Sequence, residues 1–259
     1  MIEKKAYIGA RIFDGTDEHF GAALLIEKKK ILKIVSQEDV GSDCEIISLN
    51  KGIICPGFVD IQVNGGGGCL LNDAPSLQRL EKICDTHAKL GTTSLFPTLI
   101  SDVPDVTKAA QNCAIEASEK NIPSFIGLHL EGPHLASSRS GAHDKSVIKP
   151  MDKNDCLELA TLAKKISKVL ITVAPEAVSV EHIEQLTAAG EIVSLGHSDC
   201  SFSQAQELAT AGATGVTHLF NAMSQFGSRE PGLVGAALEL GHLSAGIIAD
   251  GFHVDEATI

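Results

Sequence analysis

The sequence predicts a parallel (β/α) barrel of the TIM type, preceded by a small β subdomain. From about residue 54 onward, short apolar runs alternate with segments of helical periodicity, the pattern of parallel strands buried on both faces. Glycines follow several of the helical segments, as they do at helix ends. Polar residues also gather directly after the apolar runs, at the strand ends where barrel enzymes hold their active sites.

We expect seven parallel strands separated by six helices in the barrel. The strands are expected at 58–63, 93–96, 125–130, 169–173, 192–195, 215–219 and 245–249. The helices are expected at 76–90, 103–120, 152–166, 180–189, 203–211 and 233–240. The pattern therefore predicts a (β/α)8 barrel truncated after about seven βα units, with strand 8 missing.

The first part of the chain has a different pattern. Short strands separated by tight turns are expected at 6–13, 22–27 and 31–35. We therefore divide the chain into 1–54, the N-terminal part of a β-sandwich subdomain, and 55–259, the incomplete barrel.

Composition excludes several classes of function. A net charge of -12 and an aromatic content of 4% disfavour nucleic acid, which favours basic grooves and stacking rings. No long apolar run or signal peptide is visible, so neither a membrane span nor secretion is expected. Seven cysteines without a Cys-x-x-Cys pair suit a reducing compartment. A cytoplasmic protein follows, and an anionic small molecule remains possible as its ligand.

Three residues at strand ends form a candidate metal site. Glu131, His197 and His218 together supply one carboxylate and two imidazoles, a set that suits zinc or a similar ion with open positions. A bound divalent ion polarises a carbonyl oxygen and lowers the pKa of water, as amide hydrolysis requires. The alternative is that each histidine is a hydrogen-bonded core residue.

Gln62 and Asn64 alternate on the first barrel strand and point to the same side, where a two-metal hydrolase would place two histidines. Amides are poor ligands for a zinc-like ion, so we expect one divalent metal. Zinc is expected, and iron, manganese or cobalt would suit the same ligands. Gln62 could bind through a water or hold a weak second ion. Its amide could equally form hydrogen bonds with backbone groups of the barrel.

Three further features have both a functional and a structural interpretation. His143 lies in a polar loop and could face a substrate or solvent. Arg229 precedes a helix and could bind a phosphate together with the helix dipole, or pair with Glu230. The glycines at 65–68 could approach a phosphate or form a tight turn.

Six segments resemble, in order over essentially the whole chain, the N-acetylglucosamine-6-phosphate deacetylases of the amidohydrolase superfamily. The segments are 56–65 (PGFVDIQVNG), 129–133 (HLEGP), 196–198 (GHS), 217–223 (THLFNAM), 229–232 (REPG) and 248–253 (IADGFH). The Gln-x-Asn pair in the first segment, in place of the superfamily's usual His-x-His, marks this branch.

The resemblance implies a reaction and a set of roles. The reaction is hydrolysis of N-acetylglucosamine 6-phosphate to glucosamine 6-phosphate and acetate. Glu131, His197 and His218 are implied as metal ligands, and His143 as the group that polarises the carbonyl. The implied substrate contacts are Ala142, His143, Asn221, Ala222, Arg229, Asp250 and His253. In the family, the arginine at the position of Arg229 reaches the phosphate across a homodimer interface.

One role has no residue in this chain. The family places the general base, an aspartate, at the end of strand 8, which we expect to be missing, and Asp250 is the nearest carboxylate. A non-catalytic fragment that binds metal and sugar phosphate is therefore the alternative function. A hydrolase of cyclic ureides or other amides is disfavoured, because strand 4 ends in Ala174-Pro175-Glu176 rather than a metal-bridging lysine and no His-x-His is present.

Overall fold

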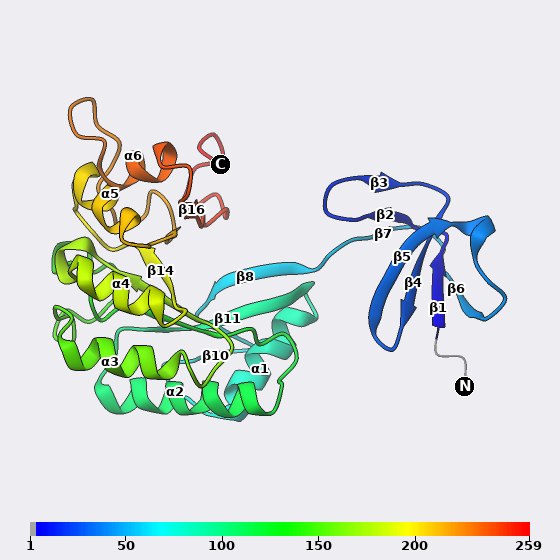
Figure 1. Cartoon of the computed structure of the whole chain (residues 1–259), viewed down its shortest axis with the longest axis horizontal. Coiled ribbons are helices and arrows are strands. Elements are labelled where there is room, and N and C mark those ends of the chain that lie inside the picture. The colour runs from blue at the N-terminus through cyan, green and yellow to red at the C-terminus, as the bar shows by residue number, and fades with distance from the viewer. Residues whose placement is uncertain (1–3) are drawn as a thin grey trace. The chain divides into compact units, whose positions relative to one another are not determined.

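The computed structural model describes residues 4–259, and the chain divides into two compact units, Met1–Phe58 and Val59–Ile259 (Figure 1). Within the described residues, no helix has the length and apolar character needed to cross a membrane.

The first unit contains two small β-sheets. A four-stranded sheet has the order β5-β4-β1-β6, and a three-stranded sheet has the order β3-β2-β7. The strands are β1 Lys4–Ile8, β2 Arg11–Phe13, β3 Glu18–His19, β4 Ala22–Glu27, β5 Lys30–Ser36, β6 Cys44–Ser48 and β7 Ile53–Ile54, with a 3-10 turn η1 at Gln37–Asp39. Ile12, Ala22 and Leu24 form its buried core.

The strand expected at 6–13 is two strands that belong to different sheets. Gly9 separates them with a φ of 85°, a left-handed conformation that favours glycine. A side chain there would also place its Cβ 2.2 Å from the carbonyl oxygen of Leu49. The backbone therefore turns at Gly9, which the alternation of apolar residues alone does not reveal.

The second unit is built on a seven-stranded sheet with the order β16-β15-β14-β13-β12-β11-β8. The strands are β8 Phe58–Val63, β11 Thr92–Ile100, β12 Leu128–Glu131, β13 Val169–Val173, β14 Ile192–Leu195, β15 Gly215–Val216 and β16 Ser244–Ala245. The registers from β11 through β16 are all parallel. Each strand lies beside the next in sequence, so right-handed crossovers place the connecting helices on one side, as in a barrel.

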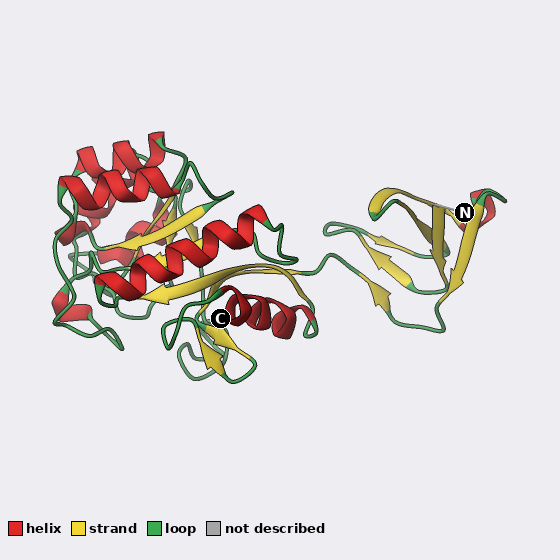
Figure 2. Cartoon of the chain, turned by 90° about the horizontal axis from the view of Figure 1, so that it is seen from below, coloured by secondary structure: helices red, strands yellow, loops and turns green. Residues whose placement is uncertain are grey.

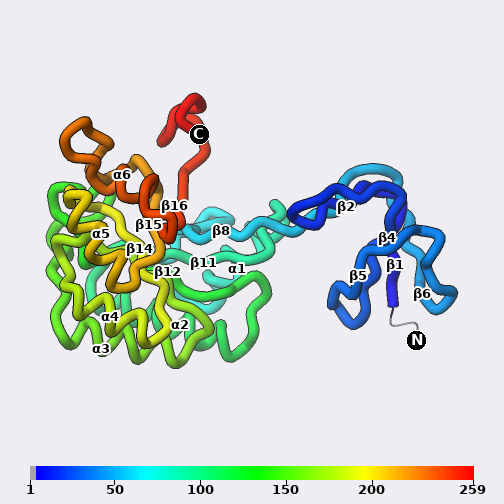
Figure 3. The backbone as a smooth tube through the Cα atoms, turned by 45° about the horizontal axis from the view of Figure 1, so that its top comes forward, coloured from blue at the N-terminus to red at the C-terminus, as the bar shows by residue number. Residues whose placement is uncertain are grey.

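The helices flank these strands. In Figure 2 they are the red ribbons beside the yellow arrows, and Figure 3 shows the same elements as a labelled backbone tube. They are α1 Leu77–Ala88, α2 Pro104–Glu119, α3 Lys153–Leu162, α4 Val180–Ala188, α5 Phe202–Thr210 and α6 Gly232–Glu239, with the 3-10 turns η2 Ser137–Arg139 and η3 Pro175–Ala177. Capping boxes start α3, α4 and α5, with Asp152, Ser179 and Ser201 accepting from the first-turn amides.

Several elements differ in length from the sequence expectation, among them β11, β15 and α3. β11 continues through Pro97 to Ile100, whereas we predicted its end at 96. β15 stops at Val216 because His218, Phe220 and Ala222 have positive φ angles that break the extended chain. α3 ends at Leu162, where the amide of Lys165 bonds the Leu162 carbonyl at 2.8 Å in a tight turn.

The glycine-rich segment after β8 forms a hairpin. β9 Gly65–Gly66 pairs antiparallel with β10 Cys69–Leu70, and Gly67 and Gly68 make the turn with φ angles of 60° and 80°. These two angles suit glycine and few other residues. The structure thus supports the tight turn over the phosphate loop for this segment.

Candidate functional site

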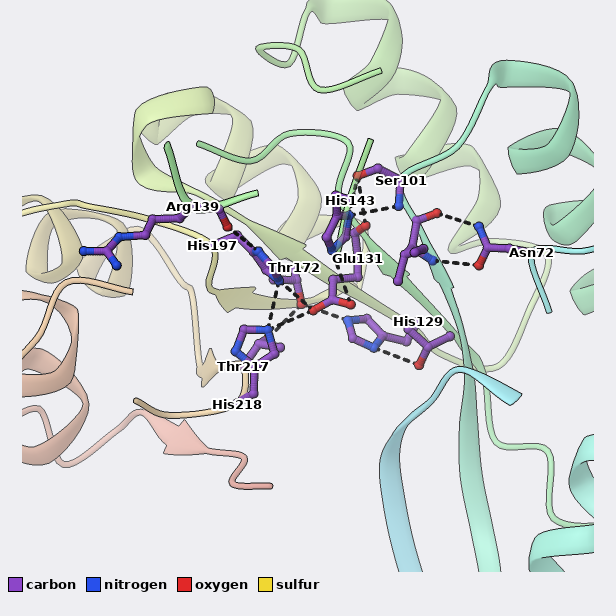
Figure 4. A network of polar contacts seen from close by, with 12 residues as sticks. Asn72, Ser101, His129, Glu131, Arg139, His143, Thr172, His197, Thr217 and His218 are labelled. Atoms are coloured by element: carbon purple, nitrogen blue, oxygen red, sulfur yellow. Dashed lines mark hydrogen bonds and ion pairs between the residues drawn. The ribbon is translucent and has the colours of Figure 1, made fainter. Parts of the chain in front are cut away.

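Glu131, His197 and His218 meet at the carboxyl ends of the central strands (Figure 4). Glu131 is the last residue of β12, and the two histidines follow β14 and β15 by two residues. The Nε2 atoms of His197 and His218 lie 3.2 and 3.1 Å from Oε1 of Glu131 and 3.0 Å from each other. The three residues that the sequence singled out therefore point their ligand atoms at one another.

The backbone directs both histidines into the site. His197 and His218 have φ angles of 48° and 38°, in the left-handed region that non-glycine residues rarely adopt. Such strain persists only where the surrounding structure holds it, and it concentrates at functional sites. Both side chains are buried, at 5% and 8% exposure.

The electrostatics of Glu131 depend on its imidazole neighbours. Burial raises the pKa of its carboxyl, but the neighbouring imidazoles of His143, His197 and His218 outweigh burial and hold that pKa well below its usual range. The carboxyl is therefore an anion at neutral pH despite an exposure of only 3%. An anionic oxygen beside two imidazole nitrogens is a suitable ligand set for a divalent cation.

The hydrogen bonds around the ligand atoms also suit a metal. The Nδ1 of His197 lies 2.7 Å from the carbonyl oxygen of Arg139, and because a carbonyl only accepts, Nδ1 donates to it and Nε2 is the nitrogen that faces Glu131. The Nδ1 of His218 is buried without a hydrogen-bond partner among the described residues. Ligands about 2.1 Å from a zinc ion lie roughly 3.0–3.4 Å apart, close to the spacings here.

His143 lies beside this cluster, closer to it than a solvent-facing loop histidine would be. Its Nε2 is 3.7 Å from Oε2 of Glu131, and its ring packs edge-on against His197 with 4.5 Å between centroids. Glu131, His143 and His197 offer ligand atoms that all lie within 4.8 Å of one another. The structure thus brings a third imidazole to the site, at only 2% side-chain exposure.

A cavity of about 440 Å³ opens next to His218. Gln62 and Asn64 of the β8 segment line it together with His129 and Asp250. The carboxylate of Asp250 accepts from the backbone amide and the Nδ1 of His253, with 2.7 Å to Nδ1, and these bonds lower its pKa to about 2. Gln62 and Asp250 therefore both face the space beside the candidate ligands.

The remaining predicted contact residues lie in loops. Ala142, Arg229 and His253 are exposed, whereas Asn221 and Ala222 are partly buried in the turn after His218. Arg229 has no side-chain hydrogen bond or ion pair within residues 4–259. Glu230 instead accepts from the amides of Phe202 and Gly232, so the expected alternative pair of Arg229 with Glu230 does not form.

One residue beside the site, Ser101, was not noticed in the sequence, whereas His129 was expected to support Glu131 from the same face of its strand. Ser101 follows β11 directly and contacts His143, but we had ended that strand at Phe96, four residues too early to notice it. His129 joins Thr98 and Thr172 in a buried chain of hydrogen bonds, 3.1 and 2.8 Å long, beneath Glu131. Burial lowers the pKa of His129 to about 4, so it is neutral at pH 7.

Comparison with known proteins identifies the family. No family model matches the chain. It is 42% identical over 206 residues to N-acetylgalactosamine-6-phosphate deacetylase from a Shewanella species, covering 80% of this chain and 52% of that protein. It is 33% identical over 257 residues to N-acetylglucosamine-6-phosphate deacetylase from Haemophilus influenzae, covering 99% of this chain and 67% of that protein. The chain belongs to the N-acetylglucosamine-6-phosphate deacetylase family.

Solved structures agree with this membership. The crystal structure of N-acetylglucosamine-6-phosphate deacetylase from Pasteurella multocida matches with a TM-score of 0.92 and 36% identity, covering 97% of this chain and 66% of that one. The enzyme of the same name from Mycobacterium smegmatis, in complex with N-acetyl-D-glucosamine-6-phosphate, matches with a TM-score of 0.88 and 27% identity, covering 98% of this chain and 66% of that one. The family resemblance and the predicted fold class are thus confirmed.

The deacetylase-family chain spans between about half and two thirds of the length of these relatives. The match to the Haemophilus influenzae protein covers 99% of this chain, including the region of the candidate metal ligands and His143.

Proposed function

We propose that this chain deacetylates an N-acetylamino-sugar 6-phosphate, with N-acetylglucosamine 6-phosphate as its substrate and glucosamine 6-phosphate and acetate as products. The convergence of Glu131, His197 and His218 to within 3.2 Å, in a member of a deacetylase family, is the observation that supports it. We place the reaction in the cytoplasm.

We further propose that Glu131, His197 and His218 hold one divalent ion, with zinc expected and iron, manganese or cobalt compatible. A bound ion would lower the pKa of a water molecule and polarise the acetyl carbonyl. Gln62 lines the adjoining cavity and would contribute through a water, since an amide is a weak ligand for such an ion.

His143 is proposed to donate from Nε2 to the acetyl oxygen, where negative charge develops as the amide is attacked. Its buried position beside Glu131 supports this role. Ala142, Asn221, Ala222, Asp250 and His253 are proposed to position the sugar. Arg229 is proposed to bind the phosphate of a neighbouring protomer in a homodimer. An exposed guanidinium without a partner among the described residues supports that assignment.

The proposal is tested by acetate release. The general base of the family is expected on an eighth strand, so the rate for these 259 residues is compared with the rate for a version extended through that strand. The proposal is supported if either chain releases acetate and the substitution His197→Gln abolishes that release. If both chains bind metal and sugar phosphate without release, the non-catalytic alternative replaces it.

The identity of the sugar is a separate question. The 42% identity to an N-acetylgalactosamine-6-phosphate deacetylase favours that C4 epimer as a second candidate substrate. The values of kcat/KM for the two epimers decide between them, and a preference for the galacto epimer would replace our first assignment.

A further inference from the structure

Ser101 contacts the Nδ1 atom of His143 through two different groups (Figure 4). Its backbone amide donates to Nδ1 at 3.2 Å, and its hydroxyl Oγ lies 2.8 Å from the same atom. Ser101 directly follows β11, so the strand holds its amide in place. Ser101 and His143 are both buried, with exposures of 7% and 6%.

The amide decides where the proton of His143 resides. A backbone N–H can only donate, so Nδ1 of His143 must accept and cannot carry a hydrogen. The N–H of the ring is then at Nε2. The hydroxyl strengthens this state, because its oxygen is nearer to Nδ1 than to the alternative acceptor, the carbonyl of Glu131 at 3.4 Å.

His197 has the opposite arrangement 4.5 Å away, measured between ring centroids. Its Nδ1 meets the carbonyl of Arg139, which can only accept, so Nδ1 of His197 carries a hydrogen. Main-chain groups of opposite polarity therefore act on the Nδ1 atoms of two adjacent imidazoles. Nδ1 of His197 carries a hydrogen, and Nδ1 of His143 does not.

We propose that Ser101 is a positioning residue that keeps His143 in the tautomer with Nε2–H, and thereby makes it a hydrogen-bond donor instead of a third imidazole ligand. The separation of 3.7 Å between Nε2 and Oε2 of Glu131 is too long for a hydrogen bond, so this donor is free for another acceptor. The identification of this acceptor as the acetyl oxygen rests on the proposed function. The assignment of the tautomer does not depend on it.

Space for the Ser101 hydroxyl is provided by Gly132. A Cβ at that position would lie 2.2 Å from Oγ of Ser101, and Gly132 has a φ of 83°. The glycine that follows the ligand Glu131 thus leaves room for the group that orients His143.

The direct test is the protonation of each ring nitrogen, measured by long-range ¹H–¹⁵N correlation spectra of the 259-residue chain with ¹⁵N-histidine. His143→Gln and His197→Gln assign the signals. We expect His143 to show protonated Nε2 with bare Nδ1, and His197 to show a protonated Nδ1. On addition of Zn²⁺, His143 should keep its Nε2 proton. A proton on Nδ1 of His143, or loss of the Nε2 proton with zinc, overturns the proposal.

The variant Ser101→Ala tests the contribution of the hydroxyl, and Ser140→Ala is its matched control. Ser140 is a buried serine whose carbonyl accepts from the amide of His143, but whose hydroxyl makes no hydrogen bond in the described structure. Ser101→Ala should shift the Nδ1 signal of His143 toward the value for a mixture of tautomers and should leave the zinc stoichiometry unchanged. Ser140→Ala should leave the Nδ1 signal of His143 unchanged. Unchanged His143 signals in Ser101→Ala overturn the role of the side chain.

Activity provides the second measurement. In whichever chain releases acetate, Ser101→Ala should lower kcat by roughly ten-fold with little change in KM, the scale at which outer partners of active-site groups act. Absence of acetate release by every chain would refute the proposed function alone, because the tautomers are measured without substrate.

Discussion

Glu131 and Glu191 are two buried carboxyls of the barrel unit with opposite electrostatic character. Their exposures are 3% and 5%, so burial alone does not distinguish them. Glu131 ends β12 among three imidazoles, and its pKa is held well below the usual range. Glu191 precedes β14, its two oxygens have no partner among the described residues, and burial raises its pKa to about 8.

The difference shows how partners, rather than burial, decide what a buried acid can do. The carboxyl ends of barrel strands hold functional sites, and the amino ends contribute to stability. Glu131 lies at the carboxyl end of its strand and is an anion at neutral pH. Glu191 lies at the amino end of β14. At neutral pH it is a protonated acid, and its ionisation reduces the stability of the fold.

The largest expected effect is on zinc affinity, which should depend on Glu131 and not on Glu191. Glu131→Gln removes the anionic ligand and should weaken zinc binding roughly hundred-fold or more, since each ligand of a zinc site contributes about 3 kcal/mol. Glu191→Gln should leave affinity unchanged. Competition with a chromophoric chelator measures both, and equal affinities for the two variants would contradict the assignment of Glu131 as a ligand.

The next effect is the pH dependence of stability due to Glu191. Its pKa is raised from about 4.5 in the unfolded chain to about 8 in the folded one, so the folded state binds more protons between these values. Its contribution to the free energy of unfolding is therefore full below pH 4.5 and falls as pH rises to 8, by about 1.4 kcal/mol per pH unit.

Urea unfolding from pH 5 to 8.5 should show this slope in the wild-type chain and a smaller one in Glu191→Gln. The variant should gain relative stability as pH rises. Parallel curves for the two proteins would show that Glu191 has an ordinary pKa.

A smaller effect is expected in the hydrogen-bond chain beneath Glu131. Thr172 lies 2.8 Å from Nε2 of His129 and 2.7 Å from the hydroxyl of Thr217, and it is fully buried. Thr172→Val keeps the shape but leaves polar partners unsatisfied, which should cost about 2 kcal/mol of unfolding free energy. Thr161→Val, on the exposed face of α3, is the control, and a similar loss in both variants would argue against the buried chain.

The smallest effect concerns the loop whose carbonyl orients His197. Asp199 accepts from Nε of Arg139 at 2.5 Å and from Ser138 at 2.7 Å, and so fixes that loop. Asp199→Asn should weaken zinc binding about ten-fold, as outer partners of metal ligands do. Asp73→Asn, which breaks a comparable pair with Arg79, should not weaken it. Unchanged zinc affinity in Asp199→Asn would show that the pair does not support the ligand.

The sequence predicted the barrel and the approach of three ligands because both follow from short-range patterns. Apolar runs locate the strands, and parallel strands bring their carboxyl ends to one edge. The approach of His197 and His218 to Glu131, at 3.2 and 3.1 Å, agrees with that rule. Strand ends set by local backbone were less predictable, as the positive φ angles that shorten β15 illustrate.

Ser101 shows why one residue that contacts the site was missed. Proline is rare inside strands, yet β11 continues through Pro97 to Ile100, whereas we predicted its end at Phe96. Had the strand been extended, Ser101 would have stood at its carboxyl end, where side chains of interest are expected. Loop residues such as Arg229 and His253 have no comparable rule, because their positions depend on contacts that periodicity does not encode.

X-ray absorption spectroscopy of the zinc-loaded 259-residue chain tests the central claim most directly. One ion per chain, bound by two imidazoles and a carboxylate, is the result that we predict from Glu131, His197 and His218. Three imidazoles in the first coordination sphere would place His143 among the ligands, and the absence of a stoichiometric ion would contradict the metal site itself.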